Sequence, residues 1–304
     1  MSKVNWVDSI KGIGIILVVL GHISSPFTEF IYSFHMPLFF IISGFFIKPS
    51  NDLKMEVLKS IKKIFTPFII YLAIGFFVEF IKRFYLNRDQ IIIEDLINAL
   101  IFMDYSNLEG TYAFVLWFFP ALFIGRLVVL TILKYQNTIF LRLLSVLIVF
   151  LIGFNFNFPF AIDDGFISVP FIFLGYYLFN NHNLFFRKKA SIFLIVILAL
   201  ILIFNGLPHL NQSTKFFDSV LINFLWACSI SILLFTVFNF YNYKIRGISF
   251  IGANSLSIFL WHPYTNNVAH FMSENYIIKF AISFSLCLIL IYTKGFIAKK
   301  IKND

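Results

Sequence analysis

The sequence predicts an all-α, polytopic membrane protein with about ten transmembrane helices. Hydrophobic residues make up 60% of its 304 residues, and the mean hydropathy is +0.87. Charged residues account for only 13%, whereas soluble domains carry about 25%. The apolar residues form runs of roughly 20, the length that crosses a bilayer, and these runs are apolar on every side, as membrane helices are. A soluble globular fold is therefore excluded.

The predicted spans follow one another closely and leave no room for a large soluble domain, so a single membrane domain covers residues 1–304. The stretch from Arg88 to Met103 mixes apolar residues with Glu94, Asp95 and Asn98. It is predicted to be an amphipathic helix at the interface or in a loop. The spans expected from hydropathy are 8–24, 29–47, 64–81, 112–133, 139–155, 165–180, 190–205, 217–239, 248–268 and 276–298.

Lysine and arginine residues are concentrated in alternate loops, beginning with the segment before the first span. Cytoplasmic loops carry such an excess of positive charge, so both termini are expected in the cytoplasm, with the protein in the plasma or inner membrane of the cell. The net charge of +9 then reflects topology and attraction to anionic lipid, and no nucleic acid partner is expected. The loops predicted to lie outside hold only Lys82, Arg83, Arg88 and Lys215.

Ionisable residues inside spans are candidate site residues, because each disfavours insertion by about 2.5–3.5 kcal/mol. Lys11 and His22 are eleven residues apart, which places them about 20° from the same helix face and about 16 Å apart along the axis. An extended ligand with an anionic end could lie between them. Lys11 could instead be an ordinary anchor that reaches the interface. The full set is Lys11, His22, His35, Glu79, Arg126 and His262.

Two further histidines are expected in the same outer half of the membrane as His22. His35 follows a short turn around Pro26 and either assists chemistry or orients the helical hairpin. His262 stands directly before Pro263, so its alternative role is to cap a carbonyl at a proline kink.

Five lysines lie between Lys48 and Lys63, at the cytoplasmic entry to the third predicted span. Lys59 and Lys63 are four residues apart and share a helix face. Such a cluster could hold phosphates as point charges, or it could be a solvated positive loop.

Several enzyme classes are excluded by missing motifs. The sequence contains no glycine-rich phosphate loop, no Gly-x-Ser-x-Gly and no Cys/His metal spacing. ATPases, serine hydrolases and zinc enzymes are therefore not expected, and neither is a metal site.

Two N-terminal segments resemble the opening of the acyltransferase-3 family of membrane enzymes. In this family a basic residue, usually arginine, precedes a histidine with ten residues between them, and Lys11 and His22 keep this spacing. The segments that carry the likeness are Asp8-Ser9-Ile10-Lys11-Gly12-Ile13-Gly14 to Leu20-Gly21-His22, and Phe34-His35-Met36-Pro37 to Phe45. Weaker similarity follows at Lys59-Ser60-Ile61-Lys62-Lys63-Ile64-Phe65-Thr66-Pro67, 116–119, 173–177 and 255–263, so it runs through most of the chain.

The resemblance implies an enzyme that O-acylates, most often O-acetylates, a surface polysaccharide or glycan precursor. Acetyl-CoA is the expected donor, and no cofactor is expected to stay bound. The expected partners are acyl-CoA, the glycan acceptor and membrane lipid. A transporter or flippase for a glycolipid or polysaccharide intermediate is the alternative that the residues alone leave open. The expected catalytic residues are His22 and His35, and the expected donor-binding residues are Lys11, Lys59, Lys62 and Lys63.

Overall fold

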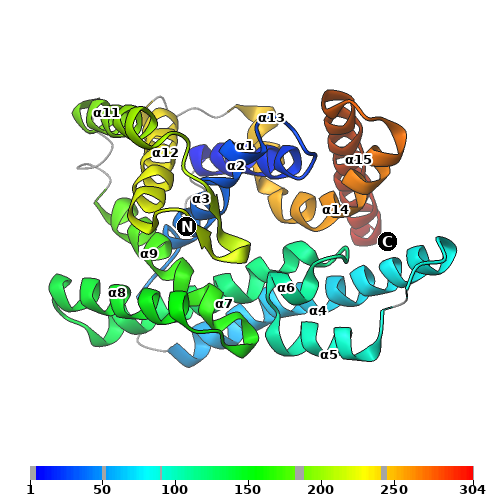
Figure 1. Cartoon of the computed structure of the whole chain (residues 1–304), viewed down its shortest axis with the longest axis horizontal. Helices are drawn as coiled ribbons and strands as arrows, with labels where there is room; N and C mark the ends of the chain where they lie inside the picture. Colours follow the sequence, from blue (N-terminus) through cyan, green and yellow to red (C-terminus); the bar gives the residue numbers. More distant parts are fainter. Residues whose placement is uncertain (1–4, 50–52, 90, 182–187, 241–244, 304) are drawn as a thin grey trace. The chain divides into compact units, whose positions relative to one another are not determined.

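The computed structural model describes residues 5–49, 53–89, 91–181, 188–240 and 245–303, and these ranges are almost entirely helical (Figure 1). The strands in them, β1 (Leu210–Asn211) and β2 (Phe216–Phe217), have two residues each and flank the short helix η3 (Gln212–Thr214). The prediction of an all-α protein is therefore confirmed.

The chain separates into two compact units, each described by itself. The first unit contains residues 1–35, 186–210 and 218–304, and the second contains residues 36–185 and 211–217. The helices of the first unit are α1 (Asn5–Gly21), α2 (Thr28–Tyr32), α11 (Lys188–Asn205), α12 (Val220–Phe240), α13 (Arg246–Ala253), α14 (Ser255–Met272) and α15 (Tyr276–Asn303). Those that lie wholly or, in the case of α3, almost wholly in the second are α3 (His35–Gly44), α4 (Leu53–Tyr85), α5 (Ile93–Phe102), α6 (Tyr105–Leu108), η1 (Phe114–Trp117), α7 (Phe118–Tyr135), α8 (Ile139–Asn155), η2 (Pro159–Ala161) and α9 (Ile162–Asn180).

Long apolar helices support the prediction of a membrane protein. Among the described residues, five helical segments are long and apolar enough to cross a bilayer. The helices over 139–155 and 190–205 are also apolar but shorter. The count of ten spans and the cytoplasmic termini stay predictions. The five segments are Ser60–Tyr85, Phe114–Tyr135, Pro159–Asn180, Val220–Asn239 and Tyr276–Lys294.

Two of the predicted spans are each divided into two helices. The span over 29–47 is broken between α2 and α3, where the Ser33 hydroxyl donates to the carbonyl of Phe30 at 2.7 Å. The span over 248–268 is broken at Asn254, whose backbone N–H is shared between the carbonyls of residues 250 and 251. A hydropathy average does not register such local hydrogen bonds, because both breaks lie inside apolar sequence.

In the first unit, α1 packs very closely against α13. The hydroxyls of Ser9 and Ser249 are 2.7 Å apart. A methyl group at Gly252 would collide with the backbone carbonyl of Asp8, and one at Gly12 would collide with that of Ile248. Small residues permit this close approach, as they commonly do between membrane helices. The contact fixes the helix that carries Lys11.

In the second unit, glycines also bring helices together. A methyl group at Gly125 of α7 would collide with the Ser168 hydroxyl of α9, and one at Gly175 of α9 would collide with the carbonyl of Ile41 in α3. Just before α9, Phe160 and Ala161 both have left-handed backbones, with φ of 62° and 49°. Non-glycine residues rarely adopt this conformation, and two in succession sharply redirect the chain into the first turn of α9.

Candidate active site

The backbone places His22 directly after the last turn of α1. Its N–H bonds to the carbonyl of Val18 at 3.2 Å, which continues the helical ladder. Lys11 and His22 therefore lie on nearly the same face, about 16 Å apart along the axis, as their spacing predicts. Lys11 also pairs with Asp8, one turn earlier, with 2.6 Å between Nζ and Oδ1.

Three imidazoles and a phenol gather beside the end of α1. The hydroxyl of Tyr32 lies 3.0 Å from Nδ1 of His22. The rings of His22 and His262 have centroids 5.2 Å apart, and those of Tyr32 and His35 are also separated by 5.2 Å. We call these four residues the histidine group. It joins His22 and His35, the two histidines expected from sequence to be catalytic, and adds His262 from α14.

Backbone carbonyls set the tautomers of two of these histidines. Nδ1 of His35 lies 2.8 Å from the carbonyl of Ile31, and Nδ1 of His262 lies 2.8 Å from that of Phe259. A carbonyl oxygen only accepts hydrogen bonds, so each Nδ1 carries a proton. In the neutral rings, each Nε2 then holds the lone pair that can accept a proton.

The carbonyl of Phe259 is available to His262 because residue 263, directly after this histidine, is a proline. Pro263 has no backbone N–H, so it cannot donate to the carbonyl four residues earlier in α14. The imidazole of His262 takes its place. The capped-carbonyl role considered for this histidine is thus what the contact shows, and the same contact orients the ring toward His22.

The three histidines differ in exposure. His262 is completely buried, and His35 is 5% exposed. His22 is half-buried, which leaves it the most accessible of the three.

A second layer of hydrogen bonds supports the position of His22. The side-chain amide of Asn266 lies 3.4 Å from the carbonyls of Val19 and His22. Its oxygen accepts a short hydrogen bond from the Ser283 hydroxyl of α15. Three helices, α1, α14 and α15, are thus tied together around the histidine group.

The expected donor-binding lysines are distributed over both units. Lys11 belongs to the first unit, whereas Lys62 and Lys63 are exposed on α4 of the second. Lys59 belongs to α4 by its backbone, but its side chain lies outside the described part of the chain. A common anion site formed by these lysines stays a prediction.

The two remaining ionisable candidates have local partners in the second unit. Glu79 accepts from Arg83 at 3.1 Å and pairs with Lys82 at 3.4 Å, both one turn further along α4. Arg126 donates to the carbonyl of Ser43 at the end of α3. The contacts of Glu79 lie within the end of α4, and that of Arg126 joins α7 to the end of α3. Both residues belong to the second unit, whereas the histidine group belongs to the first.

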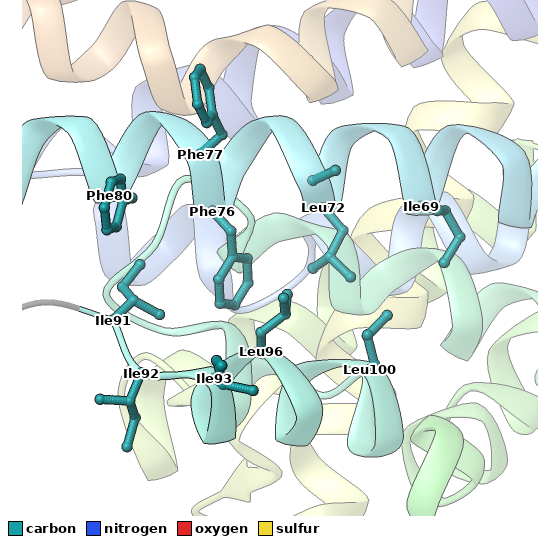
Figure 2. A pocket seen from close by; sticks show the side chains of 11 residues that line it. Ile69, Leu72, Phe76, Phe77, Phe80, Ile91, Ile92, Ile93, Leu96 and Leu100 are labelled. Carbon is teal, nitrogen blue, oxygen red and sulfur yellow. The ribbon is translucent and has the colours of Figure 1, made fainter.

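An apolar cavity of about 460 Å³ lies between α4 and α5. Figure 2 shows Leu72 and Phe76 of α4 directed toward Leu96 and Leu100 of α5. Every lining residue is apolar, so the cavity offers no side chain that can attack a thioester or transfer a proton. Its chemistry therefore differs from that of the histidine group. The helix α5 also lies where the sequence predicts an additional, non-spanning helix.

Sequence reasoning missed two members of this site. Tyr32 is an ordinary aromatic in an aromatic-rich segment, and only its distance of three residues from His35 could have drawn attention to it. Asn266 follows His262 by four residues, which places both on one face of a helix. That spacing is a usable signal, but the contact with α1 depends on tertiary structure.

These features define a helical membrane protein with a potential acid–base site built on histidines. A family model described as an acyltransferase domain matches residues 4–295, so the chain belongs to the acyltransferase-3 family. It is an acyltransferase that transfers groups other than aminoacyl groups. No curated protein and no solved structure matched the chain in the other comparisons.

Proposed function

We propose that this enzyme transfers an acyl group, acetyl in the first instance, from acyl-CoA to a hydroxyl of a surface polysaccharide or glycan precursor. The observation that carries the proposal is the half-buried His22, whose Nδ1 lies 3.0 Å from the hydroxyl of Tyr32 and whose ring lies beside that of His262. The proposal also includes three predictions from the sequence: a location in the plasma or inner membrane of the cell, about ten spans and cytoplasmic termini.

In the general-base route, the Nδ1–H of His22 donates a hydrogen bond to the Tyr32 hydroxyl, so Nε2 carries the lone pair. Nε2 of His22 removes the proton of an acceptor hydroxyl while the oxygen of that hydroxyl attacks the thioester carbonyl. The tetrahedral intermediate collapses to the ester, and the departing thiolate of CoA takes the proton from the imidazolium. Such catalysis by a positioned histidine typically contributes about 10²–10⁴-fold in rate.

In the covalent route, His22 itself attacks the thioester and becomes acylated, with release of CoA. The acceptor hydroxyl then attacks the acyl-imidazole and returns free His22. A neighbouring imidazole whose Nε2 holds a lone pair can accept the hydroxyl proton in this second step, and His35 and His262 both have that tautomer. Trapping of an acyl-enzyme with radiolabelled acetyl-CoA would select this route.

Donor binding is assigned in the same proposal to Lys11, Lys59, Lys62 and Lys63. The phosphates of CoA carry several negative charges, and lysines bind them as point charges. The ion pair with Asp8 holds the Lys11 ammonium at a defined height on α1. From there to His22 the distance along the axis is about 16 Å, which an extended pantetheine arm would follow.

The test is the O-acyl content of extracellular glycans, measured by NMR in cells that make the wild-type chain or His22→Ala. Immunoblotting of membranes confirms equal amounts of both proteins. We expect the ester signal to disappear in the variant while glycan export continues. Persistent esters together with reduced export would contradict the proposal and favour a transporter or flippase.

A further inference from the structure

The second unit contains a buried polar cluster that the histidine group does not use. It comprises Asp163 and Asp164 in the first turn of α9 and Gln212 and Lys215 at η3. Asp163 and Asp164 are each 2% exposed, and Gln212 is 4% exposed. Carboxylates are rarely buried so completely unless something satisfies them.

Only part of this cluster is satisfied internally. Asp163 forms a short ion pair with Lys215, whose ammonium also donates to the side-chain oxygen of Asn157 at 2.7 Å. Within the described ranges, both carboxylate oxygens of Asp164 and both side-chain polar atoms of Gln212 lack a hydrogen-bond partner. The second oxygen of Asp163 is in the same condition. Native proteins bond nearly all such buried groups to protein, to ordered water or to a ligand.

The unsatisfied groups come from separate elements of the second unit. Asp104, the N-cap of α6, is an electrostatic neighbour of Asp164, as are Asp163 and Lys215. The helix η3, which carries Gln212, packs against α6. Gln212 begins the η3 turn that ends at Lys215, whose ammonium pairs with Asp163, so it is a polar group independent of the acidic pair.

The chemistry of the cluster favours neutral hydroxyl donors. Carboxylate oxygens accept hydrogen bonds from hydroxyls, and a glutamine amide both donates and accepts. A cation would have to sit beside the Lys215 ammonium, which repels it. In the described part of the chain, no group of three His, Cys, Asp or Glu side chains is arranged to hold a metal ion.

The cluster also has a polar route from the surface. Asn157 is exposed, Lys215 is half-buried, and Asp163 is buried, so the hydrogen bonds lead inward step by step. Phe160, three residues before Asp163 in the chain, is 52% exposed. An exposed aromatic face next to hydrogen-bonding groups suits a ligand that has both apolar C–H faces and hydroxyls.

We propose that the cluster of Asp163, Asp164, Gln212 and Lys215 is a binding site for a neutral, polyhydroxylated ligand, namely a sugar unit of the glycan acceptor. This inference rests on the proposed function, since it names the residues that recognise the acceptor. Asp164 and Gln212 would exchange hydrogen bonds with sugar hydroxyls, while the contact with Lys215 orients Asp163.

The site can be tested by direct binding, without any acyl donor. The probe is surface polysaccharide of the source cells, de-esterified with mild alkali and cut into oligosaccharides. Saturation-transfer NMR is recorded with purified protein in nanodiscs. We expect Asp164→Asn and Gln212→Leu to weaken binding at least 10-fold, and the exposed-site control Asp89→Asn to bind as the wild type does. Unchanged binding in the first two variants would overturn the proposal, as would preferential binding of a polyamine.

A kinetic measurement separates failure of this site from failure of the proposed function. If the wild type binds the oligosaccharides but never acylates them, the proposed function fails and the site stands. If it acylates them, Asp164→Asn should raise the acceptor KM at least 10-fold with a much smaller change in kcat. If Asp164→Asn instead lowered kcat at least 10-fold and left the acceptor KM unchanged, the binding role would be overturned.

Thermal unfolding guards against a variant that merely misfolds. Asp164→Leu removes an unsatisfied buried carboxylate, so we expect a higher Tm in the absence of ligand and no further rise when oligosaccharide is added. The wild type should gain Tm on addition of oligosaccharide. A lower Tm in Asp164→Leu, with the ligand-induced rise retained, would assign Asp164 a structural role and overturn the proposal.

Discussion

The histidine group and the cluster around Asp164 differ in how most of their buried polar atoms are bonded. In the histidine group, Nδ1 of each imidazole faces a protein oxygen at 2.8–3.0 Å. In the cluster, the carboxylate of Asp164 and the amide of Gln212 have no such partner among the described residues. The first arrangement is organised before any substrate arrives, as proton transfer requires, whereas the second is completed by what binds to it.

The largest expected effect separates the two regions by kinetics. We expect His22→Ala to lower kcat by about 10²–10⁴-fold, because a general base or nucleophile is lost. High acceptor concentration should not restore this rate, but it should largely restore the rate of Asp164→Asn. The measurement is acyl transfer at increasing oligosaccharide concentration. If a high acceptor concentration restored the rate of His22→Ala, kinetics would no longer distinguish the histidine group from the cluster around Asp164.

The next effect concerns the contact that fixes α1. In Gly252→Ala the new methyl group meets the backbone carbonyl of Asp8, so we expect a loss of about 1–3 kcal/mol in stability. Gly247→Ala is the matched control in the same helix, since nothing lies within 4 Å of its added methyl. It should be neutral or stabilising by up to about 1 kcal/mol. Thermal unfolding in detergent compares the two, and equal Tm values would contradict the packing.

The hydrogen bonds behind His22 predict a loss of similar or smaller size. Asn266→Leu leaves two backbone carbonyls and the Ser283 hydroxyl without the amide, which costs about 1–3 kcal/mol of stability. Asn155→Leu removes an exposed amide that bonds only locally, and it should change the Tm little. The expected changes in Tm then have opposite signs. Asn266→Leu lowers the Tm because it removes a hydrogen-bonded amide, and Asp164→Leu raises it because it removes an unsatisfied carboxylate. A raised Tm in Asn266→Leu would remove that distinction.

The smallest expected effect belongs to Tyr32. Tyr32→Phe keeps the ring but removes the hydroxyl at Nδ1 of His22, a hydrogen bond worth about 0.5–1.5 kcal/mol. We expect kcat to fall roughly 3–10-fold, with little change in the KM for acyl-CoA or for the acceptor. Tyr85→Phe, at a residue 78% exposed on α4, is the control. A loss as large as that of His22→Ala would show that Tyr32 itself takes part in proton transfer.

The helices were largely predictable, because apolar run length determines where a membrane helix can form. The predicted span over 139–155 coincides with α8, and that over 165–180 lies within α9. Hydropathy failed at the breaks beside Ser33 and at Asn254, where hydrogen bonds inside apolar sequence end one helix and begin another.

The candidate site was predictable only where its residues share a helix. The common face of Lys11 and His22 follows from eleven residues of helical rotation. The contact of His22 with His262 joins residues 240 positions apart, and no local pattern encodes it. Asp163 and Asp164 were overlooked because they stand just before the apolar block that predicts a span. Two adjacent carboxylates among only 15 acidic residues were nevertheless a visible signal.

The pairing of His262 with Pro263 has a consequence for how the site could change by mutation. Replacing Pro263 with alanine would supply a backbone N–H for the carbonyl of Phe259, in competition with the imidazole. The imidazole of His262 would then share that carbonyl with the new N–H, although no atom of the histidine itself had changed. Pro263 therefore affects the tautomer of His262 although its own side chain cannot ionise, and a substitution at either position alters the same hydrogen bond.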